Sequence, residues 1–235
     1  RLCADAGVCD DFAEPAESIL TKAFSKLVAV DSRRWIKFLT DILPRFSCEL
    51  AASLPDFEKR MLQMFYITVF QEAADWRSHT TQANMQLLAD SPIMMHELYA
   101  LLALNLERID FIDQPVPLGF DCPLDLHCTY TRDQILIAMD YMTPKNVREG
   151  VKWLPDKQVD VFFITLNKAD KDYSPTTMYN DYSTNESLFH WQSQSTTSDT
   201  ASTGQRYINH RQRGSRVVLF VREFKQDSIG AAPYT

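Results

Sequence analysis

Glycine is scarce in this sequence, with only six in 235 residues. An NTPase needs a glycine-rich loop followed by Lys and then Ser or Thr to cradle phosphates, and no segment here matches that pattern. A nuclease of the phospholipase D type needs a Lys two residues after a His. That spacing occurs at none of the histidines, which are His79, His96, His127, His190 and His210. The sequence therefore excludes ATP hydrolysis and this nuclease chemistry.

The sequence also lacks a long apolar run. No stretch approaches the roughly 18 residues that a membrane helix needs, and no basic stretch followed by an apolar one marks a signal peptide. We therefore predict a soluble, cytoplasmic protein with no membrane partner. Because the chain begins with Arg1 rather than Met, and its last residues follow a strand-like run without a polar tail, we interpret it as a piece of a longer protein.

Cysteine is too sparse for a disulfide framework or a zinc module. The five cysteines are an odd number, and no two of them have the two-residue spacing of zinc knuckles or redox motifs. Cys122, His127 and Cys128 come nearest to a metal-binding group, but a single pair with five intervening residues is a weak signal. The pattern favours a reducing compartment and no metal site.

Charge is unevenly distributed along the chain. The formal net charge is −7, but up to Asp125 there are 19 acidic and 11 basic residues, against 12 acidic and 13 basic residues in the remainder. Within residues 203–226, Glu223 alone opposes six basic residues, which are Arg206, Arg211, Arg213, Arg216, Arg222 and Lys225. The second half of the sequence is therefore predicted to have a basic patch.

The first half of the chain has the apolar periodicity of helices. Apolar residues recur at three- and four-residue steps in 17–30, 31–43 and 56–71. Ser91 and Pro92 supply an N-cap and a first-turn proline for a further helix. We predict a helical bundle over residues 1–112. Residues 113–125 contain three prolines and a glycine, which cannot continue a helix and indicate a linker.

Residues 126–235 mix helix and strand signals. Thr131 and Gln134 have capping-box spacing at the start of a short helix. The β-branched and aromatic runs at 159–166 and 215–224 predict strands, with 188–195 as a third candidate. Another short helix is expected over 205–212 and ends before Gly214. The whole chain is therefore predicted to be α+β, with a bundle followed by a mixed α/β domain.

The third candidate strand has the most unusual side chains. Alternation would place Trp191 on one face, and His190, Gln192 and Gln194 on the other. Tryptophan stacks on bases, while amides and imidazole hydrogen-bond base edges or phosphates. The alternative is a buried aromatic pair, Phe189 with Trp191, beside a solvated polar face. The residues of this strand alone favour that alternative.

Basic residues follow this segment and change the balance. Arg206, His210 and Arg213 fall at four- and three-residue steps, so the expected helix would present them on one face. Arginine clusters supply the salt-dependent part of nucleic-acid affinity, although many surface helices have a basic face. Together, the two segments make nucleic-acid binding a serious candidate.

One enzymatic pattern is present near the C-terminus. Glu223 and Lys225 follow an apolar run and resemble the Glu-x-Lys strand of restriction-type nucleases, in which carboxylates hold a divalent metal and lysine orients the attacking water. The nearest upstream acid, Asp199, lies in a Ser/Thr-rich loop that is poorly suited to a metal ligand. Solvated side chains on one strand face are the simpler interpretation, and a metal-dependent nuclease stays an alternative.

Several long stretches, in order, resemble one family. They are residues 124–135 (LDLHCTYTRDQI), 174–182 (SPTTMYNDY), 189–194 (FHWQSQ), 203–207 (TGQRY) and 218–223 (VLFVRE). Residues 106–235 are similar to the domain of unknown function 3427 at the C-terminal end of bacterial superfamily II (DEAD/DEAH-type) helicases that carry a phospholipase-D-like nuclease. The preceding helices resemble the region between the helicase core and that domain. The resemblance implies a curved, partly open barrel-like sheet that continues beyond residue 235.

The resemblance also implies that the catalytic domains precede this chain. ATP and Mg²⁺ would serve the helicase core, and this fragment would need no cofactor. The leading hypothesis is a non-catalytic accessory region of a restriction or phage-defence protein. It would bind DNA, including a modified or extruded base, and present it to the helicase and nuclease domains of the same polypeptide. The second hypothesis is an intramolecular docking module for the helicase core.

The DNA-binding hypothesis assigns a role to particular residues. The DNA-reading residues would be His190, Trp191, Gln192 and Gln194. The phosphate contacts would be Arg206, Arg211, Arg213 and Arg216. Tyr179 and Tyr182 would stack nearby.

Overall fold

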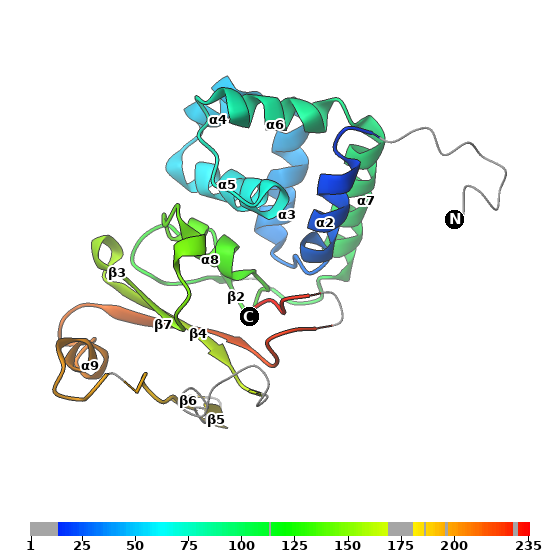
Figure 1. Cartoon of the computed structure of the whole chain (residues 1–235). Coiled ribbons are helices and arrows are strands. Elements are labelled where there is room, and N and C mark those ends of the chain that lie inside the picture. Colours follow the sequence, from blue (N-terminus) through cyan, green and yellow to red (C-terminus); the bar gives the residue numbers. More distant parts are fainter. Residues whose placement is uncertain (1–13, 113, 169–180, 186, 196, 228–229) are drawn as a thin grey trace. The chain divides into compact units, whose positions relative to one another are not determined.

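The computed structural model describes residues 14–112, 114–168, 181–185, 187–195, 197–227 and 230–235. The chain divides into two compact units, Arg1–Gln114 and Pro115–Thr235. Most of the expected linker, residues 113–125, therefore falls within the second unit. The described residues form eight α-helices and several small sheets, so the α+β class is confirmed (Figure 1).

The first unit is helical. Its described elements are α2 (Glu17–Leu27), α3 (Arg33–Ile42), the 3-10 helix η1 (Leu43–Arg45), α4 (Cys48–Ser53), α5 (Asp56–Phe70), α6 (His79–Ala89) and α7 (Pro92–Arg108). Helix α5 packs against α2, α3 and α4, and its residues are buried from Arg60 to Val69. The fully buried Trp35 of α3 donates its indole N–H to the carbonyl of Met61 at 2.9 Å. Helix α5 is therefore the centre of this unit.

The helices expected over 17–30, 31–43 and 56–71 are confirmed as α2, α3 and α5. Helix α7 begins at Pro92 as expected, but the side chain of Ser91 does not cap it. The carboxylate of Glu14 instead accepts the N–H groups of Ile93 and Met94, at 2.9 and 2.7 Å. Helices α4 and α6 were not predicted. The buried residues of α6 are Thr81, Met85 and Leu88, so only two apolar side chains mark its buried face.

Across the described residues, no single helix is both long and apolar enough to cross a membrane. Helices α6 and α7 pass that test only as a pair, and the chain bends by 83° between them.

The second unit is built on a three-stranded sheet in the order β3–β4–β7. Strand β3 (Val151–Leu154) is antiparallel to β4 (Val159–Thr165), which is parallel to β7 (Arg216–Arg222). Every residue of β4 is buried, as expected for a central strand with both faces covered. The smaller elements are β1 (Gln114–Pro115), β2 (Asp125–Leu126), α8 (Arg132–Ala138), η2 (Pro144–Asn146), η3 (Pro155–Lys157), β5 (Tyr182–Asn185), β6 (Leu188–His190) and α9 (Ser202–Ile208).

Helices α8 and α9 lie against opposite faces of this sheet (Figure 1). Alternate side chains of β4 point to opposite faces. On one face, the ring of Tyr207 on α9 lies 5.1 Å from that of Phe162. On the other, the guanidinium of Arg132 on α8 lies 4.6 Å from the ring centroid of Phe163. Near the C-terminus, Tyr234 also contacts Phe163, with 5.3 Å between the ring centroids.

The sequence predicted the main elements of this unit better than their ends. The capping box of Thr131 and Gln134 is confirmed, as are strands β4 and β7. The strand expected at 188–195 is shorter, because its pairing with β5 stops at His190. The helix expected over 205–212 ends at Ile208, and Gly214, at φ 70°, is the last residue of the turn that follows it. The described strands do not close into a barrel, so the barrel-like sheet stays a prediction.

Candidate functional site

A cavity of about 590 Å³ lies in the second unit, beside the end of strand β4. Three of the predicted reading residues line it, namely Trp191, Gln192 and Gln194. The lining also has five basic and two acidic side chains, which are Arg132, Arg148, Lys168, Arg222 and Lys225 with Glu149 and Asp181. This site combines an aromatic ring, two amides and an excess of positive charge.

The cavity lies where β4 extends beyond the start of β3, because β3 begins at Val151, opposite Phe162. The last β3–β4 contact is the hydrogen bond from the Phe163 N–H to the carbonyl of Gly150, at 2.7 Å. Thr165 continues β4 past this point and lines the cavity, together with Gly150 and Phe163. The segment after β6 brings Trp191 to this region from the face of Phe162, with 4.2 Å between the ring centroids. Side chains from both faces of the sheet therefore meet around the edge of β4.

A buried ion pair holds the chain in place at Trp191 and Gln192, two of the residues proposed to read DNA. The Asp181 carboxylate accepts from the ammonium of Lys168 at 2.6 Å and from the backbone N–H of Gln192 at 3.0 Å. The Lys168 and Asp181 side chains are only 8% and 4% exposed. Breaking such a pair leaves one buried charge uncompensated. Asp181 thus fixes the chain next to Trp191 against the residues that follow β4.

Two arginines enter the cavity from the face of Phe163. Arg222 is held in position, because its Nε donates to Thr165 Oγ1 at 2.9 Å and its Nη1 donates to the Ala232 carbonyl at 3.1 Å. Arg132 donates through Nη2 to the carbonyl of Glu149, but its buried Nε has no hydrogen-bond partner among the described residues. Burial is the largest effect on Arg132 and lowers its pKa, and the nearby Arg222 lowers it further. A bound anion would offset both effects.

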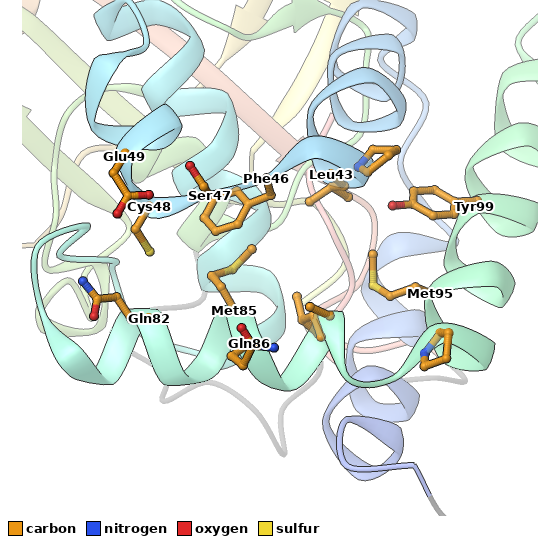
Figure 2. A pocket seen from close by; sticks show the side chains of 14 residues that line it. Leu43, Phe46, Ser47, Cys48, Glu49, Gln82, Met85, Gln86, Met95 and Tyr99 are labelled. Carbon is orange, nitrogen blue, oxygen red and sulfur yellow. The ribbon is translucent and has the colours of Figure 1, made fainter.

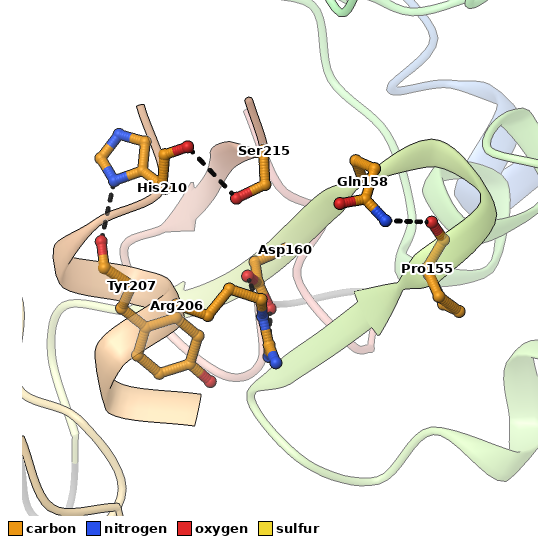
Figure 3. Close-up of polar contacts among 7 residues, drawn as sticks. All are labelled: Pro155, Gln158, Asp160, Arg206, Tyr207, His210 and Ser215. Carbon is orange, nitrogen blue, oxygen red and sulfur yellow. Dashed lines mark hydrogen bonds and ion pairs between the residues drawn. The ribbon is translucent and has the colours of Figure 1, made fainter. Parts of the chain in front are cut away.

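Arg206 has a structural role that its sequence position did not reveal (Figure 3). Its Nε and Nη2 donate to the two carboxylate oxygens of the fully buried Asp160, at 2.8 and 2.9 Å. The guanidinium also lies 4.3 Å from the ring centroid of Trp153. The hydrogen bonds with Asp160 are the main reason that its pKa is raised. Two of the three guanidinium nitrogens of Arg206 therefore already bind a carboxylate of the protein itself.

The remaining arginines form an exposed group, which we call the arginine cluster and define as Arg211, Arg213 and Arg216. None of the three lines the cavity in the described structure. Arg216 begins β7, whereas Arg222, which does line the cavity, ends it. Seven strand residues span about 20 Å. The predicted site is therefore divided between two ends of one strand.

The expected common face of Arg206, His210 and Arg213 is not formed. Helix α9 ends at Ile208, so His210 lies in the turn that follows it. There its Nδ1 forms a 2.8 Å hydrogen bond with the Tyr207 carbonyl (Figure 3). The prediction that these three residues share one helical face was therefore wrong.

The predicted stacking residues lie on the β5–β6 hairpin or outside the described residues. Tyr182 and His190 are paired across the hairpin and stack on each other, with 4.8 Å between the ring centroids. Both are exposed. Tyr179 lies outside the described residues. Tyr182 and His190 therefore lie next to each other, but neither residue is part of the described lining of the cavity.

The two residues of the nuclease alternative, Glu223 and Lys225, have different surroundings. Lys225 lines the cavity. Glu223 is exposed, and its carboxylate accepts from the side-chain amide of Asn167 at 3.4 Å. In the described part of the chain, no three His, Cys, Asp or Glu side chains converge in an arrangement that would hold a metal ion. The geometry therefore adds no support for a metal-dependent nuclease at Glu223.

The first unit has a second cavity of about 540 Å³, lined by residues of η1, α4, α6 and α7 (Figure 2). Met85, Met95 and Tyr99 are among its lining residues. Burial is the main cause that raises the pKa of the Cys48 thiol, and Glu49 adds to it. A raised pKa keeps the thiol protonated and makes it a poor nucleophile. Nothing in this lining indicates a catalytic group.

Sequence reasoning missed several residues of the site in the second unit. Arg132 was considered only as part of a capping-box helix, and Lys168 and Asp181 were not singled out. Arg222 and Lys225 were counted in the basic patch but not assigned to DNA binding. Arg222 could have been identified from the sequence, because it is the last residue of an apolar strand. Side chains of adjacent strands meet at such an end.

Comparison with known proteins identifies a family for this region only. No curated protein and no solved structure matches the chain. Residues 124–234, which include every residue lining the cavity beside β4, match the model of a family described as a domain of unknown function (DUF3427).

Proposed function

We propose that the second unit binds DNA as a non-catalytic accessory module. The observation that carries the proposal is the cavity beside β4, where Trp191, Gln192 and Gln194 share one lining with an excess of basic side chains. Phosphates are held by arginine and lysine, and bases are read by amides and aromatic rings. Both kinds of side chain line this cavity.

The arginine cluster extends this surface along β7. Its distance from the cavity, about 20 Å, corresponds to about six base pairs of duplex DNA. The cluster would contact the backbone without reading sequence, while the cavity would receive the part of the DNA that is recognised. This division explains why the aromatic and amide side chains lie at one end of the strand and the exposed arginines at the other.

The resemblance to helicase-associated domains suggests the biological setting. We propose that the module belongs to a bacterial defence or restriction protein and presents bound DNA to the helicase and nuclease domains of the same polypeptide. ATP and Mg²⁺ would be used by the helicase core.

Exposed apolar side chains favour a second candidate, a docking surface for the helicase core. Leu188 is 60% exposed, Phe224 is 51% exposed and Ile208 is 62% exposed. Single exposed apolar side chains are common, and side chains of this kind mark a surface that contacts another protein where they form one patch. Docking through them would depend little on salt, whereas DNA binding weakens steeply as salt increases.

The proposal is tested with Arg211→Glu combined with Arg213→Glu. We expect affinity for duplex DNA, measured by fluorescence anisotropy at low salt, to fall by at least about tenfold, because two phosphate contacts become repulsive. Lys22→Glu combined with Lys37→Glu is the matched control, since it makes the same charge change on exposed residues of the first unit. Equal losses in both variants would contradict a specific role for the cluster. Cleavage of the DNA when Mg²⁺ is added would instead favour the nuclease alternative.

A further inference from the structure

We infer that the cavity beside β4 receives one unpaired nucleotide of the bound DNA, with its phosphate near Arg132, Arg222 and Lys225 and its base near Trp191 and Gln194. This inference rests on the proposed DNA binding and specifies the part of the DNA that is recognised. It assigns different chemical groups of one ligand to different sides of the cavity.

The size of the cavity limits what can enter. Its volume of about 590 Å³ is within the range of small-molecule sites. A nucleotide turned out of the helix fits a site of this kind, whereas a base pair stacked between its neighbours does not. DNA would therefore have to offer an unstacked nucleotide.

The charges favour a phosphate on the side of Arg132. Asp181 is paired with Lys168, so its carboxylate does not oppose an incoming anion as a lone charge would. Glu149 is exposed, and hydrogen bonds from backbone N–H groups, including that of Arg148, lower its pKa and keep it ionised. The remaining basic residues still outnumber this single carboxylate. Arg132, Arg222 and Lys225 all line the cavity, so a phosphate on this side would meet three positive charges.

The side of Trp191 suits a base. Its ring is fixed, because Phe162 lies 4.2 Å away and Tyr207 contacts it edge-on at 5.5 Å. The part of this ring that lines the cavity would give a base an aromatic contact. The side-chain amide of Gln194 can provide donors and an acceptor for a base edge. An abasic nucleotide would lose these contacts and keep only the phosphate.

Three duplexes of one sequence test the inference with the full chain. The first is fully paired, the second has one bulged nucleotide, and the third has an abasic residue at the bulge. We expect the bulged duplex to bind at least about tenfold more tightly than the other two, because its nucleotide is already unpaired and retains its base. Equal affinities for all three would overturn the inference and leave the proposed DNA binding intact. Failure to bind any of them would overturn both.

Variants separate the two sides of the site. Gln194→Ala should reduce the preference for the bulge over the abasic duplex. Lys225→Gln should weaken binding to both of these duplexes, and Arg132→Gln should do the same if the variant folds. Arg213→Gln is the matched comparison, because it should weaken all three duplexes equally and keep the bulge preference. Loss of the preference in Arg213→Gln but not in Gln194→Ala would contradict the assignment.

Free nucleotides distinguish the source of the ligand. We expect a deoxynucleoside monophosphate to displace the bulged duplex at lower concentration than the matching nucleoside, and inorganic phosphate alone to displace it poorly. Equal competition by the nucleotide and the nucleoside would contradict the phosphate contact. Tighter binding of the free nucleotide than of the bulged duplex would contradict DNA as the source.

Discussion

At the scale of single residues, Arg206 shows how a basic side chain can serve the fold. Its bidentate contact with Asp160 joins α9 to the central strand, and Trp153 lies beside the guanidinium. The sequence could not show this, because Asp160 lies within an apolar strand run and is separated from Arg206 by 46 residues. A charge pattern in sequence records which side chains are basic, but not which of them are already paired.

Removing Arg206 should destabilise the second unit. In Arg206→Ala, the Asp160 carboxylate stays buried without its partner, and we expect the free energy of unfolding to fall by about 3–5 kcal/mol. Urea denaturation measures the change. Arg213→Ala, at an exposed position, should change stability by less than about 0.5 kcal/mol. A loss below about 1 kcal/mol in Arg206→Ala would contradict the structural role.

Three of the four side chains proposed to read DNA lie around one cavity, whereas none of the four arginines proposed to contact phosphates lines it. Trp191, Gln192 and Gln194 were identified because their composition is unusual and local, and the structure brings all three to one cavity. Arg132 could not be identified in this way, because it reaches the cavity only when α8 packs against β4. Whether these residues bind DNA stays a prediction.

At the scale of elements, local signals determined which helices were predicted. The capping box at α8 and the apolar periods of α2, α3 and α5 are written in neighbouring residues. The parallel pairing of β4 with β7 is not, because Val159 pairs with Arg216 across a long connection. The helix expected over 205–212 was wrong at its C-terminal end, because helical spacing was assumed to continue beyond Ile208, where the chain forms a turn.

The start of α7 gives a test at this scale. Two backbone N–H groups there donate to Glu14, while the hydroxyl of Ser91 accepts from Ala16. We expect Glu14→Ala to lower the free energy of unfolding of the first unit by about 1 kcal/mol, as loss of a helix cap does.

Chemical denaturation of Glu14→Ala can be compared with that of Glu97→Ala, a matched change at an exposed position within α7. The second variant should differ from the parent by less than about 0.5 kcal/mol. Equal effects of the two variants would contradict the capping role.

At the scale of the whole molecule, the α+β class follows from the sequence because helix and strand patterns occupy different halves. The site depends on long-range packing, since its lining comes from residues as far apart as Arg132 and Tyr234. Net charge is also misleading at this scale. The chain is acidic overall, yet basic side chains outnumber acidic ones around the cavity.

The most direct test of the central claim is the salt dependence of duplex affinity for the unaltered chain. If the cavity and the arginine cluster together neutralise about four phosphates, the logarithm of the association constant should fall against the logarithm of salt concentration with a slope of about −3 to −4. Such a slope would support binding through the basic residues of the second unit. A slope shallower than about −1, or no binding at low salt, would contradict the account.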